Sequence, residues 1–145
     1  MATKPSGSWG QAMQAAGLDA SAVVAATAYI REAGKPAAAM LLDRSPDVTA
    51  VATGNDLLAL GLYQELGARG RSCPEDVSVV GHNDMPLMDM VHPPLTSVRI
   101  RHQEMGAEAA RLLLDQISNA GAEITTQITA PELIVRGSTQ RCGRP

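Results

Sequence analysis

Hydrophobic and polar positions follow two rhythms along the chain, one typical of short strands and one typical of amphipathic helices. Short apolar runs indicate strands, and apolar residues spaced three and four apart indicate helices. The pattern predicts helices over residues 9–16, 28–42, 58–66 and 102–118, and strands over residues 22–26, 48–52, 77–80, 95–100, 124–129 and 133–136. Because short strands alternate with helices, we expect an α/β fold, with a mainly parallel sheet covered by helices on both faces.

Three of the expected helices have a recognisable apolar stripe. Tyr29 starts the stripe of the first, which Pro36 weakens in the middle. Leu62 lies at the centre of the second, and we expect that helix to end at Gly67 or Gly70. The third stripe consists of Met105, Ala109, Leu112, Leu113 and Ile117. Gly61 lies beside the second stripe and is interpreted as a site of close helix packing.

Composition limits the chain to one domain and a few classes of partner. Its 145 residues are 45% hydrophobic and carry a net charge of −3, so there is no basic field to bind phosphates or an anionic membrane. Trp9, Tyr29 and Tyr63 are the only aromatic residues, too few to stack successive bases. The sequence has no apolar stretch long enough for a membrane span and no secretory signal. We therefore expect a cytoplasmic, globular protein that binds neither nucleic acid nor membrane directly.

Polar residues follow three of the expected strands. Asn55 and Asp56 come after the first, His82 and Asn83 after the second, and residues 101–102 after the third. Ligands of parallel sheets bind beyond the carboxyl ends of the strands, and amides suit the hydroxyl groups of a sugar or nucleoside. Two alternatives remain open at this point: Asn55 as an ordinary helix N-cap, and Asp56 as an acid favoured by the helix dipole.

An enzyme is the alternative from a different functional class. His82, Asp84, His92 and His102 could form a general-base or metal site, but no catalytic motif or metal-ligand spacing joins them. Cys73 and Cys142 are too few and too far apart for a zinc site, and we expect reduced thiols. Met85, Met88 and Met90 are interpreted as gap-filling or interface residues. We assign no catalytic residue, no metal and no cofactor.

Several motifs in a fixed order resemble the C-terminal half of LacI/GalR-type transcriptional repressors. They cover almost the whole chain, and their order is more specific than any one motif. The motifs are residues 49–51 (TAV), 54–61 (GNDLLALG), 74–81 (PEDVSVVG) and 93–98 (PPLTSV), with weaker support from residues 9–13, 17–18, 104–106 and 133–136.

The resemblance implies a Rossmann-like lobe of a type I periplasmic-binding-protein-like fold, incomplete here, that binds a sugar-like effector. In such repressors a separate helix-turn-helix domain reads DNA as a dimer. Asn55 matches a ligand-contacting Asn, Asn83 matches a usually acidic ligand residue, and His82 matches a neighbouring aromatic. Asn83 keeps hydrogen bonding but loses charge, and His82 could stack or titrate near neutral pH. Ile100 replaces a polar contact of some members.

The resemblance also implies a domain layout and a homodimer surface. It places residues 9–101 and 131–138 in the C-terminal lobe. Disordered ends at 1–8 and 139–145 are predicted from their small, polar composition. Residues 102–130 would belong to an N-terminal lobe, so we expect the stripe of the helix there to be exposed, repacked or used in a swapped oligomer. The implied dimer surface consists of Leu60, Gln64, Met88 and Val91, although Leu60 could equally be core. A fragment of a periplasmic sugar-binding protein is the alternative among binding proteins.

Overall fold

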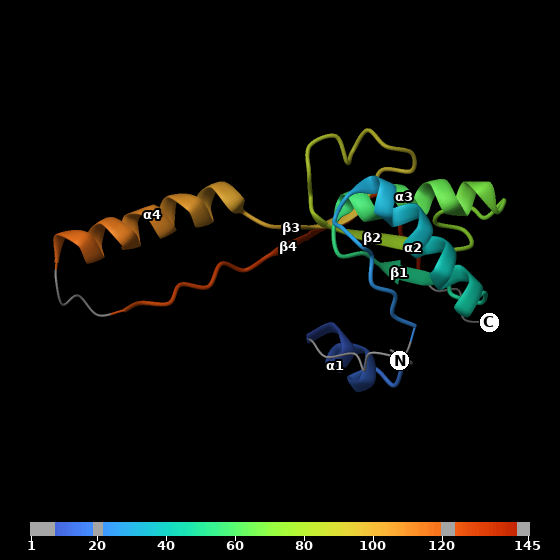
Figure 1. The fold of residues 1–145 in the computed structure, drawn as a ribbon, viewed down its shortest axis with the longest axis horizontal. Coiled ribbons are helices and arrows are strands. Elements are labelled where there is room, and N and C mark those ends of the chain that lie inside the picture. The colour runs from blue at the N-terminus through green and yellow to red at the C-terminus, as the bar shows by residue number, and fades with distance from the viewer. Residues whose placement is uncertain (1–7, 19–21, 120–123, 142–145) are drawn as a thin grey trace.

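The computed structural model describes residues 8–18, 22–119 and 124–141. Figure 1 shows two regions, a packed part that contains the sheet and a part that projects from it. We call residues 22–101 and 131–141 the lobe and residues 102–130 the arm. The helices are α1 (Ser8–Ala15), α2 (Arg31–Arg44), α3 (Asp56–Ala68) and α4 (His102–Ser118). The strands are β1 (Ala50–Ala52), β2 (Ser78–Asn83), β3 (Thr96–Arg99) and β4 (Glu132–Ile134). The chain leaves the lobe after β3, forms α4, and returns along an extended segment to β4.

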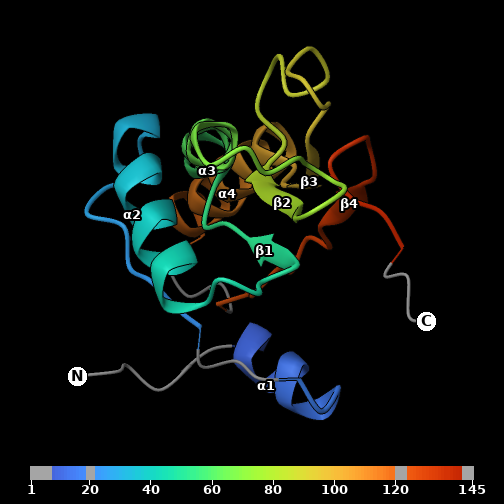
Figure 2. The ribbon, with the colours of Figure 1, turned by 90° about the vertical axis from the view of Figure 1, so that its right-hand side faces the viewer.

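The sheet has the strand order β1-β2-β3-β4. β1, β2 and β3 are parallel, with Val51 opposite Val79 and Gly81 opposite Ser97. β4 is antiparallel to β3. α2 and α3 lie on one side of this sheet, and α1 lies on the other side in both ribbon views (Figure 2). The predicted α/β fold with a mainly parallel sheet is therefore confirmed.

The core of the lobe lies between α3 and the sheet. Leu62 and Leu66 of α3 are buried, as the stripe predicted, against Val79 of β2 and Leu95 at the start of β3. Met88, from the loop between β2 and β3, completes the same cluster at 5% exposure. This cluster joins α3 to the beginnings of β2 and β3.

Two glycines allow α2 and α3 to pack closely. A Cβ on Gly61 would lie 2.6 Å from both Gly34 Cα and the Lys35 backbone nitrogen. A Cβ on Gly34 would lie 2.7 Å from the Leu58 backbone oxygen. Side chains at these positions would push the helices apart, so the interpretation of Gly61 as a packing residue is confirmed.

Three sequence predictions about elements are wrong. Residues 22–26 are half-buried or exposed, and they form no strand in the described part of the chain. α2 begins at Arg31 instead of residue 28, which leaves Tyr29 outside the helix and exposed. Residues 124–129 are extended but are not paired with any described strand. Both segments have the apolar pattern of a strand, but neither is paired with a strand in the described part of the chain.

Residues 102–119 and 124–130, the part of the arm that the structure describes, have almost no buried surface. Every residue of α4, all of which the structure describes, is exposed or half-buried. Leu113 and Ile117 are 61% and 70% exposed, and Ile128 on the returning segment is 89% exposed. Of the three outcomes expected for this helix, exposure is the one observed. Among the described helices, none is both long and apolar enough to cross a membrane.

Candidate functional site

The carboxyl ends of β1, β2 and β3 lie at one edge of the sheet, where the arm departs (Figure 1). Thr53 follows β1 and donates its hydroxyl to the Val80 carbonyl of β2 at 3.1 Å. Asn83 ends β2 and lies opposite Arg99, which ends β3. The parallel topology therefore brings Asn55 and Asn83 to one edge, as expected for residues that follow strands, and Arg99 lies at the same edge.

Asn55 caps α3 with its side chain. Its Oδ1 accepts the Leu58 N–H at 2.9 Å, and its Nδ2 donates to the Tyr29 carbonyl at 2.9 Å. The residue is 7% exposed. The N-cap interpretation is thus confirmed, and it uses the oxygen and one amide hydrogen that a ligand would otherwise need. The second amide hydrogen is the group left for a ligand.

His82 and Asn83 are half-buried neighbours at the end of β2. His82 Nδ1 lies 3.0 Å from Asn83 Oδ1, so the two side chains share a hydrogen bond. Asn83 lines an open hollow that continues along Ile100, Arg101 and His102 at the beginning of the arm. The structure therefore brings Asn83 together with the arm's first residues, while Asn55 is held by Tyr29 and α3.

Asp84 is a buried acidic side chain at this edge, with two arginine partners. Its carboxylate accepts hydrogen bonds or ion pairs from Arg99 at 2.7 Å and Arg136 at 2.7 Å, and its side chain is 5% exposed. Burial acts to raise the pKa of Asp84, but Arg136 and Arg99 outweigh burial and hold the pKa below its ordinary value. Asp84 is therefore ionised at neutral pH, with two cationic partners.

Asp56 is completely buried in the first turn of α3. Its carboxylate accepts the Ser97 hydroxyl and, at 2.7 Å, the Met85 backbone N–H. A Cβ on Gly81 would collide with this carboxylate. The helix dipole alone therefore does not account for Asp56, because the residue also joins α3 to β3 and to the loop after β2.

Tyr29 is a residue that the sequence analysis assigned to a different role. It is 70% exposed, and its carbonyl is the acceptor of Asn55. Its ring lies close to Gly54, since a Cβ there would be 2.9 Å from Tyr29 Cε1. An exposed aromatic ring at the edge of the sheet suits the apolar face of a sugar. Its position at helical spacing from Ala33 concealed this placement.

The residues of the implied dimer surface differ in exposure. Gln64 is exposed, whereas Leu60 and Val91 are half-buried and pack against the core cluster. Met88 is inside that cluster. The nearby Tyr63 hydroxyl donates to the Pro93 carbonyl at 3.2 Å, and burial raises the pKa of Tyr63. Only Gln64 of these four thus offers a well-exposed side chain.

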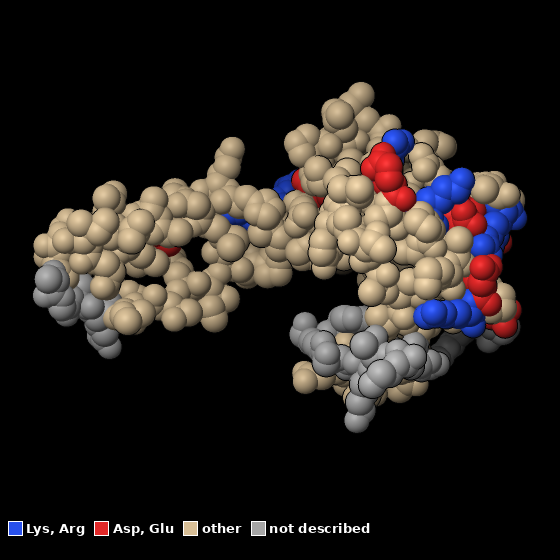
Figure 3. Space-filling model, viewed as in Figure 1, with Lys and Arg blue, Asp and Glu red and all other residues tan. Residues whose placement is uncertain are grey.

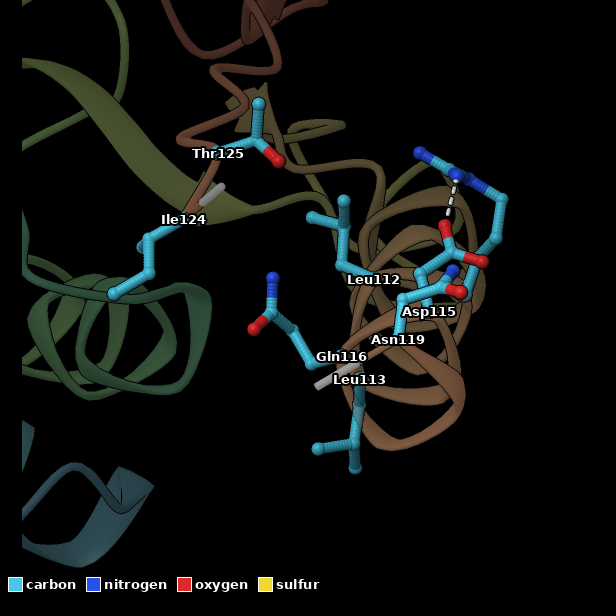
Figure 4. A pocket seen from close by; sticks show the side chains of 8 residues that line it. Leu112, Leu113, Asp115, Gln116, Asn119, Ile124 and Thr125 are labelled. Carbon is cyan, nitrogen blue, oxygen red and sulfur yellow. Dashed lines mark hydrogen bonds and ion pairs between the residues drawn. The ribbon is translucent and has the colours of Figure 1, made fainter. Parts of the chain in front are cut away.

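A second hollow lies within the arm, away from the strand ends. Figure 4 shows Leu112 and Gln116 of α4 pointing toward the segment that carries Ile124 and Thr125. The nearby Arg111 is bound to Asp115 of the same helix. This hollow lies where the returning segment runs beside α4 without forming a sheet, and its polar lining comes mainly from that one helix.

Among residues 8–18, 22–119 and 124–141, no group of three His, Cys, Asp or Glu side chains is placed to hold a metal ion. Figure 3 shows that the charged side chains on the face in view gather at the end of the lobe opposite the arm, with both signs interspersed. Arg69, for example, binds both Glu65 and Asp43 at 2.7 Å. Mixed charge of this kind does not favour a polyanion.

Comparisons with known proteins identify the family of the chain. Residues 6–139 match the family model of the periplasmic binding protein-like domain. The HTH-type transcriptional regulator MalR of Streptomyces coelicolor is 42% identical over 121 residues, which are 81% of this chain and 35% of that protein. The chain thus spans about a third of the length of this curated relative.

Solved structures of transcriptional regulators match as well. A complex of the regulator CelR with cellobiose is 39% identical, with a TM-score of 0.82 over 88% of this chain and 39% of that one. A LacI family regulator from Arthrobacter sp. FB24, in complex with lactose, is 28% identical, with a TM-score of 0.77 over 90% and 49% of the two chains. The chain therefore belongs to the periplasmic-binding-protein-like domain family, in the C-terminal effector-domain part of the LacI-type transcriptional regulators.

Proposed function

We propose that this chain forms one wall of the effector site of a LacI-type regulator and that its effector is a sugar. The observation that carries the proposal is that Asn55 and Asn83 follow neighbouring parallel strands and so lie at the same edge of the sheet. Asn83 offers an amide donor and acceptor to vicinal hydroxyls, and Tyr29 offers an exposed ring. The sugars in the CelR and Arthrobacter complexes support this class of ligand.

His82 contributes to the proposed site through Asn83. Their shared hydrogen bond orients the Asn83 amide, and the ring of His82 is half-buried beside it. Asn55 keeps one amide hydrogen for the ligand while it caps α3. Because Asn83 is uncharged, the site hydrogen bonds hydroxyl groups without a requirement for a cationic ligand.

The remaining functions of a regulator are also part of the proposal. The chain would dimerise through a surface that includes Gln64, Leu60 and Val91, with Met88 supporting it from the core. DNA would be bound in the cytoplasm by a separate helix-turn-helix domain. No catalytic step is assigned, in agreement with relatives that are transcriptional regulators by name.

Titration with cellobiose, lactose, ribose and a nucleoside, followed by amide NMR shifts of the chain, tests the proposal. We expect at least one sugar to shift amides at residues 82–84 and 100–102, and Asn83→Ala to abolish these shifts. Asn119→Ala, at the end of α4, is the matched control. The proposal is wrong if no ligand shifts these amides, or if Asn83→Ala leaves the shifts unchanged.

A second variant separates the two roles of Asn55. Asn55→Ser keeps an acceptor for the Leu58 N–H and removes the amide group. We expect this variant to unfold at the wild-type denaturant concentration but to bind the sugar more weakly. Unchanged affinity would assign Asn55 to helix capping alone.

A further inference from the structure

The turn that carries Asn83 has an unusual backbone. Asn83 and the following Asp84 have φ angles of 105° and 52°, both in the region that L-residues with a side chain rarely adopt. Two such residues in succession are unfavourable unless surrounding contacts determine their conformation. The structure should therefore contain the contacts that hold this turn, and it does.

The buried carboxylate of Asp56 fixes the backbone of this turn. The Asp84 backbone N–H donates to Ser97 Oγ at 3.1 Å, and the Ser97 hydroxyl in turn donates to Asp56 Oδ1. The next N–H, of Met85, donates to Asp56 Oδ2 at 2.7 Å. Asp56 and Ser97 are both 0% exposed. The backbone on the carboxyl side of Asn83 is thus anchored to α3 and β3.

The Asp84 side chain fixes the same turn through ion pairs with two arginines. Its Oδ2 binds Arg99 at the end of β3, and its Oδ1 binds Arg136, which follows β4. Arg136 also donates to the Leu95 carbonyl at 2.7 Å, and its backbone N–H donates to Thr96 Oγ1 at 2.9 Å. The arm leaves the lobe after β3 and returns at β4 (Figure 1).

We propose that Asp84 is a positioning residue of the effector site. Its ion pairs with Arg99 and Arg136 fix the turn at Asn83 against the two strands that lead into and out of the arm. This proposal rests on the proposed effector site. The Asp84 side chain is 5% exposed, with Oδ2 hydrogen-bonded to Arg99 and Oδ1 in ion-pair contact with Arg136, so it orients Asn83 without contacting the ligand.

Hydrogen exchange of Asp84→Asn tests the positioning role without any ligand. We expect the amides at positions 84 and 85 to exchange at least about tenfold faster than in wild type, because each ion-paired hydrogen bond contributes on this scale. The amides of α3 should keep their wild-type rates. Asp89→Asn, an exposed acid in the same loop, is the matched control and should change neither set.

Two results would overturn the proposal. One is wild-type exchange at positions 84 and 85 in Asp84→Asn, and the other is an equal loss of protection throughout α3, which a general structural role would give. Arg99→Gln removes only the more exposed partner and should show a smaller effect at the same two amides. It also provides the test if Asp84→Asn does not fold.

Sugar titration of the same variants connects the turn to the site. We expect Asp84→Asn to weaken sugar binding about tenfold while Asp89→Asn binds like wild type. If the wild-type chain binds no sugar but Asp84→Asn speeds amide exchange at positions 84 and 85, the proposed function fails and the fixing of the turn by Asp84 stands. If the wild type binds and Asp84→Asn binds equally well, the positioning role is wrong.

Discussion

The lobe and the arm each contain a helix with several leucines, yet only the lobe buries them. Leu62 and Leu66 of α3 are 2% and 1% exposed, whereas Leu113 and Leu114 of α4 are 61% and 62% exposed. α3 packs against α2 and the sheet, while α4 projects from the lobe with one extended segment beside it (Figure 1). Amphipathic spacing thus predicts a helix, but a packing partner determines whether the helix contributes to stability.

The largest difference between the two regions should come from leucine truncation. Leu66→Ala removes a fully buried side chain, and we expect it to lower the free energy of unfolding by about 2–5 kcal/mol. Leu113→Ala removes an exposed one, and we expect a change within about 0.5 kcal/mol. Urea unfolding measures both. A similar cost for the two variants would show that α4 is packed in solution.

A somewhat smaller effect is expected at Asp84, and it should depend on pH. The folded-state pKa of Asp84 is lowered, so its unfolded value of about 3.9 is the higher of the two. The stability from this carboxylate is therefore fully present above the unfolded pKa and is lost as the pH falls through the folded pKa.

Unfolding of wild type and Asp84→Asn, measured from pH 7 to pH 2, tests this dependence. We expect a difference of about 1.5–3 kcal/mol at pH 7 that shrinks once the pH falls below about 4. Asp89→Asn is again the control. A difference that stays constant down to pH 2 would argue against an ionised Asp84 in the folded lobe.

A pair of glycine substitutions should act in opposite directions. Gly61→Ala places a methyl group 2.6 Å from Gly34 Cα, so we expect it to cost about 1–3 kcal/mol. Gly106→Ala on α4 meets nothing within 4 Å and should stabilise that helix by about 0.5–1 kcal/mol. Thermal unfolding reports the first and amide exchange in α4 the second. A change in stability of the same sign for both variants would contradict the contrast between packed and unpacked helices.

The sequence correctly predicted those elements that have both an apolar pattern and a neighbouring element of this chain to pack against. The stripe of Leu58, Leu62 and Leu66 located α3, and Gly61 was identified as a packing residue. The extended segment at residues 124–129 was predicted as a strand because its composition is typical of one. A strand requires a neighbour to bond with, and composition carries no information about that neighbour.

The candidate site was predictable at the level of strand ends but not of individual bonds. Asn55 and Asn83 follow strands, and the parallel topology brought them to one edge. The partners of Asp84 were not predictable, because Arg136 lies far along the chain and reaches Asp84 only after β4 pairs with β3. Tyr29 was missed because helical spacing outweighed its position before α2.

Amide hydrogen exchange of the wild-type chain, compared between α3 and α4 in one sample, tests the central contrast most directly. We expect the amides of Asp56–Ala68 to be protected at the level of global unfolding. Those of His102–Ser118 should exchange through local opening, at least about a hundredfold faster, as for a helix with little tertiary support. Equal protection of the two helices would contradict an unpartnered arm.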